Sequence, residues 1–208
     1  MQICTNILKN MNVGLVILAA GASSRMGTPK QILPIFGKPM IIHLIDEAFK
    51  TNCHPVTVVL GANKEKIVPV LEGIPVTLVD NPFWASGMGS SVRMGLVGSY
   101  LLTKGIEALI FITSDMPYVN ADLLNEMIKL AESNDDKTIV ATKYAGTLGI
   151  PVLFKKPHFE EILELNGQFG AKQIIEKHKS KVLELAFENG KTDLDTKEDY
   201  YEFLQSKN

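Results

Sequence analysis

The feature that most constrains the fold of this chain is a repeated alternation of short apolar runs with segments of helical periodicity. Clear apolar runs cover 13–20, 56–61 and 107–115, and each contains β-branched residues. Such runs are typical of strands buried on both faces of a sheet. Segments with one apolar face follow them, most clearly over 121–132. Repeated β-then-α units predict an α/β fold with a mostly parallel sheet and helices on both faces.

The other expected elements continue this pattern. Thr196, with Asp199 three residues further on, matches a capping box and predicts a final helix. No repeat, linker or low-complexity stretch divides the chain, so we expect one domain over 1–208, with 1–12 as an N-terminal extension. The remaining expected strands cover 75–82, 138–142, 150–154 and 181–185, and the remaining expected helices cover 63–72, 87–102, 157–165, 170–178 and a segment that starts near Pro39.

The charge balance excludes several kinds of partner. The 208 residues include 21 Lys and Arg and 23 Asp and Glu, a net charge of −2, so no overall positive field favours nucleic acid. No stretch reaches the length of a transmembrane helix. The cysteines and histidines are scattered, without the spacing of a disulfide framework or a zinc motif. We therefore expect no nucleic-acid or membrane partner, and any bound anion must be held by a local site.

The first apolar run allows two interpretations. Lys9 precedes it, and the triplet Ala20-Gly21-Ala22 fits the cleavage site of a secretory signal peptide. However, the run is short for a signal peptide and only one cation precedes it. Cleavage after Ala22 would also remove the strand in front of a loop rich in hydroxyls and cations. We therefore expect a cytoplasmic protein, with the signal peptide as the alternative.

Three loops stand out at the ends of expected strands. They carry the sequences LAAGASSRMGTPKQ (18–31), DNPFWASGMGSS (80–91) and SDMP (114–117). In a parallel sheet, ligands bind at the carboxyl ends of the strands, where such loops converge. We therefore expect these three loops to form one binding site.

The loop over 18–31 has the composition of a phosphate-binding loop. Gly21 lets the backbone approach a ligand, and Ser23 and Ser24 offer hydroxyl and backbone N–H donors. Arg25 can clamp a phosphate with two N–H groups, and Lys30 adds a point charge. The glycine spacing matches neither a Walker loop nor a dinucleotide-binding fingerprint. A turn whose cations face solvent is the alternative.

The other loops supply acidic residues and a helix start. Asp115 ends a strongly apolar strand, where a carboxylate can bind Mg²⁺ or simply form a turn before proline. Gly87, Ser90 and Ser91 lie where a helix begins, so they can present N–H groups to a polar ligand or serve packing alone. Asp195, beside the final helix cap, is a candidate second metal ligand or a carboxylate that complements the helix dipole.

These motifs together resemble a known family. The stretch LAAGASSRMGTPKQILPIFGKPMI resembles the signature of nucleotidyltransferases related to the molybdenum cofactor cytidylyltransferase, and it is also similar to accessory proteins of xanthine dehydrogenase and other molybdenum hydroxylases. The resemblance continues, in the family's order, at DNPFWASGMGSSVRMGL, FITSDMPYV, GIPVLF, NGQFGAKQII and DLDTKED. It therefore spans about 13–200.

The resemblance implies a Rossmann-like, three-layer fold of the nucleotide-diphospho-sugar transferase type. It also implies transfer of a nucleoside monophosphate from an NTP to a phosphate-bearing acceptor, with Mg²⁺ as cofactor and release of pyrophosphate. By position, Arg25, Lys30 and Asp115 are the implied catalytic residues, and Asp115 with Asp195 the implied metal ligands. The implied nucleotide-binding residues are Leu18, Ala19, Ala20, Gly21, Ser23, Ser24, Arg25, Lys30, Gly87, Ser90 and Ser91.

The resemblance also bears on the substrates. The Ala19-Ala20-Gly21 form resembles the cytidylyl branch, which favours CTP over GTP, with molybdopterin as the acceptor and a molybdenum hydroxylase as the recipient. Two blocks depart from that branch. Gly149-Ile150-Pro151 stands in place of Gly-His-Pro, and 167–172 lacks the usual acid and arginine. Two alternatives therefore stay open: a sugar or polyol phosphate as acceptor, and a non-catalytic factor that delivers the cofactor.

Overall fold

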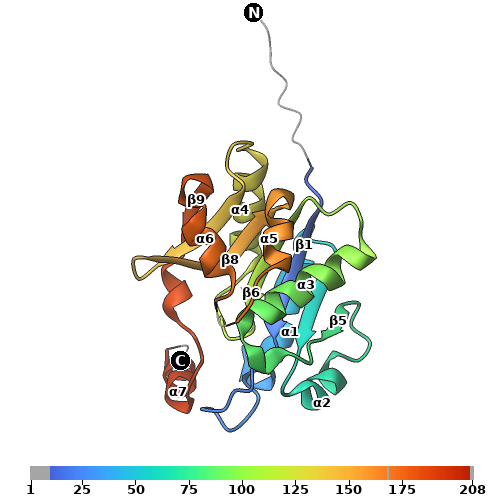
Figure 1. Ribbon diagram of the computed structural model, residues 1–208. Helices are drawn as coiled ribbons and strands as arrows, with labels where there is room; N and C mark the ends of the chain where they lie inside the picture. The colour runs from blue at the N-terminus through green and yellow to red at the C-terminus, as the bar shows by residue number, and fades with distance from the viewer. Residues whose placement is uncertain (1–9, 168, 207–208) are drawn as a thin grey trace, which may run out of the picture.

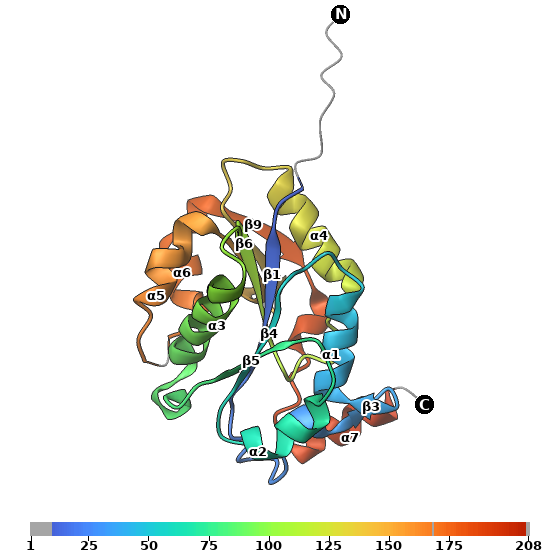
Figure 2. The same ribbon diagram turned by 90° about the vertical axis from the view of Figure 1, so that its right-hand side faces the viewer.

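The computed structural model describes residues 10–167 and 169–206. Residues 1–9, most of the expected N-terminal extension, lie outside the described residues. The fold has three layers around a seven-stranded sheet (Figure 1). Figure 2 shows the sheet nearly edge-on, with α1 and α4 on one face and α3, α5 and α6 on the other. This arrangement confirms the α/β class and the two covered faces.

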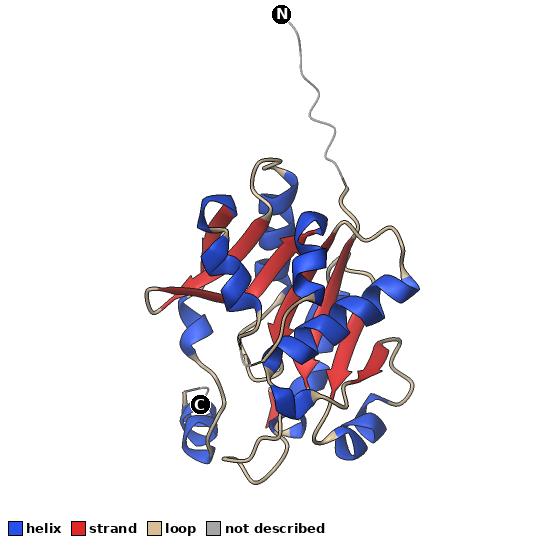
Figure 3. Cartoon of the chain, viewed as in Figure 1, coloured by secondary structure: helices blue, strands red, loops and turns tan. Residues whose placement is uncertain are grey.

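The elements alternate along the chain as expected, and Figure 3 shows them by type. The strands of the large sheet are β1 (Val13–Ala19), β4 (Val56–Leu60), β5 (Thr77–Asp80), β6 (Ala108–Thr113), β7 (Ile139–Tyr144), β8 (Thr147–Lys155) and β9 (Val182–Ala186). The helices are α1 (Met40–Phe49), α2 (Lys64–Ile67), α3 (Met88–Leu102), α4 (Ala121–Glu132), α5 (Phe159–Leu163), α6 (Ala171–Lys177) and α7 (Lys197–Gln205).

The sheet has the strand order β5-β4-β1-β6-β8-β7-β9. All neighbouring strands pair in parallel except β8, which is antiparallel to both β6 and β7. Because β8 alone is reversed, the strands on either side of it run in the same direction. The carboxyl ends of β1, β6 and β9 therefore lie at one edge of the sheet.

The central strand β1 explains how both layers are held. All seven of its residues are buried. Leu15 and Ile17 pack into the core on the side of α1 and α4. Val16 and Leu18 pack into the core on the side of α3 and α5. A strand that is apolar on both faces is typical of a buried parallel strand. The continuous apolar run in the sequence is therefore explained by the two cores, one on each face of the sheet.

The structure includes a hairpin that the sequence analysis does not predict. Strands β2 (Pro34–Ile35) and β3 (Lys38–Pro39) form a short hairpin. Phe36 and Gly37 connect them with φ values of 47° and 80°, and positive φ at both central residues is the geometry of a type I′ turn. Phe203 of α7 packs against Phe36, with ring centroids 5.5 Å apart, so the last helix covers this hairpin.

The last helix begins as expected. The backbone N–H of Asp199 donates to Thr196 Oγ1 at 3.1 Å, and the backbone N–H of Thr196 donates to Asp199 Oδ2 at 2.7 Å. This reciprocal pair confirms the capping box. Among the described residues, no helix is both long and apolar enough to cross a lipid bilayer.

Candidate active site

A cleft of about 210 Å³ lies at the carboxyl ends of β1 and β6. All three loops singled out from the sequence contribute to it, so the structure brings them together at one edge of the sheet. The cleft is lined by Leu18, Ala20, Gly21, Lys30, Gln31, Trp84, Gly87, Met88, Ser91, Thr113, Ser114 and Asp115.

Two side-chain amides hold the loop after β1. Gln31 is fully buried, and its Nε2 donates to the carbonyl oxygens of Ala19 at 3.0 Å and Gly21 at 3.2 Å. Asn63 Nδ2 donates to the carbonyl oxygens of Gly21 at 3.3 Å and Ala22 at 3.1 Å. Because these carbonyl groups are already engaged, the loop backbone is fixed before any ligand arrives. The sequence analysis did not single out either amide.

Two glycines beside the cleft serve different purposes. A Cβ atom placed on Gly21 would meet no described protein atom within 4 Å, so the protein's own packing does not require a glycine there. A Cβ on Gly61 would lie 2.6 Å from the carbonyl oxygen of Ala20 and 2.8 Å from Cβ of Trp84. Gly61 therefore lets two loops approach each other, whereas Gly21 leaves open space in the cleft itself.

A network of ion pairs lies at one end of the cleft. Lys30 Nζ donates to Asp115 Oδ2, and it donates to Asp195 Oδ1 at 2.9 Å. Arg25 Nη2 donates to Asp195 Oδ2 at 2.8 Å. The side chains of Lys30 and Asp115 are 13% and 17% exposed, whereas that of Arg25 is 67% exposed. Lys30 therefore lies at the base of the site and Arg25 at its rim.

The charges in this network shift two pKa values. Burial alone would lower the pKa of Lys30, but the charges and hydrogen bonds of Asp115 and Asp195 outweigh burial and raise it. Burial alone would raise the pKa of Asp195, but Lys30 and Arg25 outweigh it and lower that pKa. Lys30 is therefore protonated and Asp195 is ionised at neutral pH.

Asp193 is a third carboxylate in the cluster. Burial, together with the negative charges of Asp115 and Asp195, raises its pKa to about 6. The sequence analysis considered Asp195 from this segment but not Asp193. No periodicity marks Asp193 in the sequence, because this segment belongs to neither a helix nor a strand. The backbone N–H of Asp195 donates to the carbonyl oxygen of Asp193 at 3.1 Å, and Leu194 between them is fully buried.

The carboxylates fit a divalent cation. Oδ1 of Asp115 is buried and has no hydrogen-bond partner in the part of the chain that the structure describes. A buried oxygen without a partner is unfavourable unless a ligand completes it. The backbone N–H of Leu194 donates to the carbonyl oxygen of Asp115 at 3.1 Å, which fixes the two acidic segments side by side. Carboxylate oxygens are ligands that Mg²⁺ prefers.

The start of α3 closes the other end of the cleft. Gly87 has φ 117° and ψ 176°, a conformation that favours glycine. Asn81 is fully buried, and its Nδ2 donates to Ser90 Oγ at 2.9 Å and Ser91 Oγ at 3.0 Å. Ser91 lines the cleft. The Ser90 hydroxyl is directed inward, toward the carbonyl oxygens of Phe83 and Gly87.

The other residues singled out from the sequence lie around the cleft rather than in its lining. Ala19 is fully buried beneath it. Ser23 Oγ accepts from the backbone N–H of Lys30 at 3.1 Å and so shapes the loop from within. Ser24 is exposed and is not among the residues that line the cleft.

Comparison with known proteins decides the family. A model of the MobA-like NTP transferase domain matches residues 15–182, which is most of the chain. The chain belongs to the MobA-like NTP transferase family. All three loops of the cleft lie within the matched region, whereas Asp193 and Asp195 follow it.

The curated proteins similar to this chain have varied names. The chain is 35% identical over 96 residues to nicotine blue oxidoreductase of Paenarthrobacter nicotinovorans, covering 46% of this chain and 47% of that protein. It is 30% identical over 159 residues to 3-deoxy-manno-octulosonate cytidylyltransferase of Wigglesworthia glossinidia brevipalpis, covering 74% of this chain and 60% of that protein. The chain thus spans about half the length of these curated relatives.

Solved structures agree over nearly the whole fold. The crystal structure of Rv0371c from Mycobacterium tuberculosis superposes with a TM-score of 0.78 at 26% identity, covering 94% of this chain and 98% of that one. A second structure of that protein, described as a complex with manganese, gives a TM-score of 0.77 at 23% identity, covering 94% of this chain and 100% of that one.

Gly149 and Gly167, from the two blocks singled out in the sequence analysis, contact residues near the cleft. The backbone N–H of Gly89 in α3 donates to the carbonyl oxygen of Gly167 at 3.3 Å, so the connection between α5 and α6 rests on the start of α3. A Cβ on Gly149 would lie 2.9 Å from the hydroxyl of Tyr144. Burial and the charges of Asp193 and Asp115 raise the pKa of Tyr144, which places this tyrosine near the carboxylates.

Proposed function

We propose that this chain transfers CMP from CTP to a phosphate-bearing acceptor and releases pyrophosphate. An oxygen of the acceptor phosphate attacks the α-phosphorus of CTP, and the bond from that phosphorus to the β-phosphate oxygen breaks. Family membership supports nucleotidyl transfer, but one relative is named an oxidoreductase. The assignment of the reaction therefore depends on the residues of the site. The observation that carries it is the pairing of Lys30 with Asp115 and Asp195 beside a cleft floored by small residues.

The cations of the site have distinct roles in this reaction. An ammonium group has three N–H donors, and Lys30 uses two of them on carboxylates. The third can donate to a phosphate oxygen of the bound triphosphate. Arg25, at the rim, neutralises charge on the departing pyrophosphate. A phosphate acceptor is already ionised, so the site needs no general base, and catalysis depends on positioning and charge.

The nucleotide lies, in this proposal, between the loop after β1 and the start of α3. Leu18, Ala20 and Gly21 form one wall, with Gly87 and Ser91 opposite. Gln31 and Asn63 donate hydrogen bonds to carbonyl oxygens of the loop after β1. The N–H groups of that loop and the open space beside Gly21 therefore face the ligand in this proposal. Ser23 and Ser90 support these walls in our proposal rather than contacting the base directly.

Asp115 and Asp195 would hold Mg²⁺. When bound, the ion neutralises phosphate oxygens and orients the triphosphate. The unpartnered Oδ1 of Asp115 supports this assignment, and the manganese complex of Rv0371c supports a divalent cation in a protein of the same fold. Asp195 also keeps Lys30 in place, since both its oxygens accept from cations.

Molybdopterin is our proposed acceptor, and residues 1–208 act as one domain in this proposal. The proposed recipient of the finished cofactor is a molybdenum hydroxylase in the cytoplasm. The relative named a 3-deoxy-manno-octulosonate cytidylyltransferase supports a second candidate, cytidylyl transfer to a different acceptor. The departures of 149–151 and 167–172 from the cytidylyl pattern also support this candidate.

A pyrophosphate-release screen tests the proposal. Four NTPs are combined with molybdopterin and with a panel of sugar and polyol phosphates in the presence of Mg²⁺. We expect turnover with CTP and molybdopterin, and its loss in Asp115→Asn. Asp46→Asn, which removes a half-exposed partner of Lys38 away from the cleft, is the matched control and keeps full turnover. Turnover with a sugar phosphate only would replace the acceptor, and molybdopterin binding without any pyrophosphate release would favour a delivery factor.

A further inference from the structure

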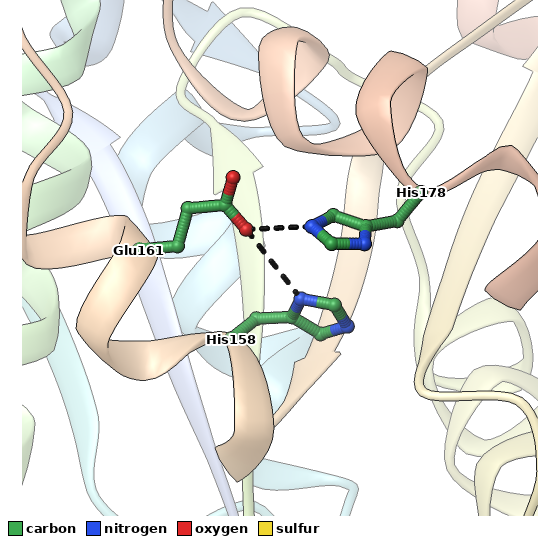
Figure 4. A group of neighbouring side chains, drawn as sticks. All are labelled: His158, Glu161 and His178. Atoms are coloured by element: carbon green, nitrogen blue, oxygen red, sulfur yellow. Dashed lines mark hydrogen bonds and ion pairs between the residues drawn. The ribbon is translucent and has the colours of Figure 1, made fainter.

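A second cluster of ligand-type side chains lies outside the candidate active site, on the helices that follow β8. Figure 4 shows the carboxylate of Glu161 pointing between the rings of His158 and His178. One ligand atom from each residue lies within 4.8 Å of the other two. Glu161 Oε2 is 2.7 Å from His178 Nε2 and 3.9 Å from His158 Nδ1. No other such group of three is found among the described residues.

Local structure explains how the three side chains meet. His158 ends a single helical turn (Lys156–His158) in front of α5, and Glu161 lies three residues further on, on the same side of that helix. His178 follows the end of α6, which packs back against α5. The sequence analysis expected no zinc motif because the histidines are widely spaced, and spacing along the chain does not show this return of α6.

The donor set is that of a transition-metal site. Two imidazole nitrogens and one carboxylate oxygen are ligands that Zn²⁺ accepts, with a fourth position left to water. At zinc–ligand distances of about 2.0–2.2 Å, tetrahedral ligand atoms lie about 3.3 Å apart. The observed separations of 2.7 Å and 3.9 Å lie on either side of that value, so small side-chain rotations open the required space.

The surroundings of the cluster orient the ligands. Nε2 of His158 is 2.7 Å from Thr138 Oγ1, which leaves Nδ1 as the nitrogen that faces Glu161. A hydrogen bond on the far nitrogen is the usual support for a metal-binding histidine. Lys177 Nζ lies 2.6 Å from Oε1 of Glu161, leaving Oε2 for a cation.

We propose that His158, Glu161 and His178 bind one divalent transition-metal ion, with Zn²⁺ the best match. The side chains of Glu161 and His178 are 24% and 30% exposed, so water reaches the fourth position. The ion ties the end of α6 to the start of α5. Gly167, in the connection between these helices, rests on the start of α3 beside the cleft. The site therefore fixes a wall of the candidate active site without contacting the nucleotide.

Titration with Co²⁺ tests this proposal on the full-length, tag-free protein. Excess Mg²⁺ is present to occupy the carboxylates of the cleft. We expect about one equivalent of Co²⁺ to produce visible absorption bands typical of nitrogen and oxygen ligation, and Zn²⁺ to displace it. His178→Gln and Glu161→Gln should abolish the bands. Thr138→Val should weaken Co²⁺ binding ~10–100-fold, because Nε2 of His158 loses its hydrogen bond to the threonine hydroxyl.

Controls separate this site from the cleft and from misfolding. His54 is exposed and distant in sequence, so His54→Gln should bind Co²⁺ unchanged. Asp115→Asn should also bind it unchanged, because Asp115 belongs to the other site. Zn²⁺ should raise the Tm of the wild-type protein but not of His178→Gln, with circular dichroism showing both to be folded. Absence of the bands, equal binding by folded His178→Gln, or loss of binding in Asp115→Asn would each overturn the proposal.

Discussion

Lys30 and Asp115 form an ion pair across 85 residues of sequence, where the loop after β1 meets the end of β6. Both side chains are mostly buried, so solvent screens their attraction less than it would at the surface. Removing the Lys30 charge leaves the Asp115 carboxylate without an ion-pair partner among the described residues, which costs more than the pair itself contributes. The pair thus joins the proposed phosphate loop to the proposed metal ligand.

Lys30→Met should lower the Tm and reduce turnover by ~10²–10³-fold, because a charge that contacts the triphosphate is lost. The double variant Lys30→Met/Asp115→Asn should recover much of the Tm, since no buried charge stays unpaired, but it should not recover turnover. Thermal unfolding and pyrophosphate release on the same preparations check both effects. A double variant no more stable than Lys30→Met would contradict the ion-pair interpretation.

Gly21→Ala and Gly61→Ala should have opposite effects. Gly21→Ala places a methyl group in open space, so the Tm should hold while the affinity for CTP falls. Gly61→Ala forces a methyl group against Ala20 and Trp84, so the Tm should fall. Calorimetric titration with nucleotide and thermal unfolding separate the two variants. Unchanged CTP affinity in Gly21→Ala would place the nucleotide elsewhere.

Asn81→Ala should destabilise the protein by about 1–3 kcal/mol, because Ser90 and Ser91 lose their buried donor. The KM for the nucleotide should rise more than kcat changes, since Ser91 lines the cleft but does not contact the reacting phosphate in our proposal. Urea unfolding and steady-state kinetics measure these effects. Asn52→Ala, at an exposed position, is the matched control and should leave both unchanged.

Protonation of His43 should contribute a loss of stability as the pH drops below its ordinary pKa of 6.5. Burial lowers the pKa of His43 from its ordinary value of 6.5, although Glu47 and the carbonyl of Pro117 oppose the shift. A group whose pKa is lower in the folded state contributes its full stability above the unfolded pKa and loses it as pH falls through the folded pKa. His158 acts in the same direction.

Unfolding in urea between pH 7.5 and pH 5 should therefore show a shallower pH dependence in His43→Gln than in the wild-type protein. The exposed His54 provides the control, because His54→Gln should keep the wild-type slope. Equal slopes in His43→Gln and the wild-type protein would show that His43 titrates alike in the folded and unfolded chains.

The sequence was enough to predict the large sheet and its helices, because their apolar periodicity is long and regular. It did not predict the β2–β3 hairpin, whose strands have two residues each and whose only signal is the pair Phe36-Gly37. It also did not predict the roles of Gln31 and Asn81. A buried amide is placed by the loops that happen to meet around it, and a single sequence does not show those meetings.

The acidic residues of the site also show how far a single sequence can predict which side chains meet. Asp115 could be placed at a ligand-binding edge because it ends a recognisable strand. Asp193 could not be ranked above its neighbours, because the segment that carries it belongs to neither a helix nor a strand. The meeting of His158 with His178 depends on how α6 returns along α5, which is a property of the packed helices rather than of their spacing.

The reversal of β8 has a consequence for how the protein is made. Because β8 runs against its neighbours, β9 ends at the same edge as β1 and β6, and the segment after it delivers Asp195 to Lys30. A ribosome synthesises the proposed phosphate loop first and this carboxylate more than 160 residues later. A nascent chain can therefore pair its central strands before Asp195 is available to Lys30, and the proposed site is complete only when the segment after the last strand has emerged.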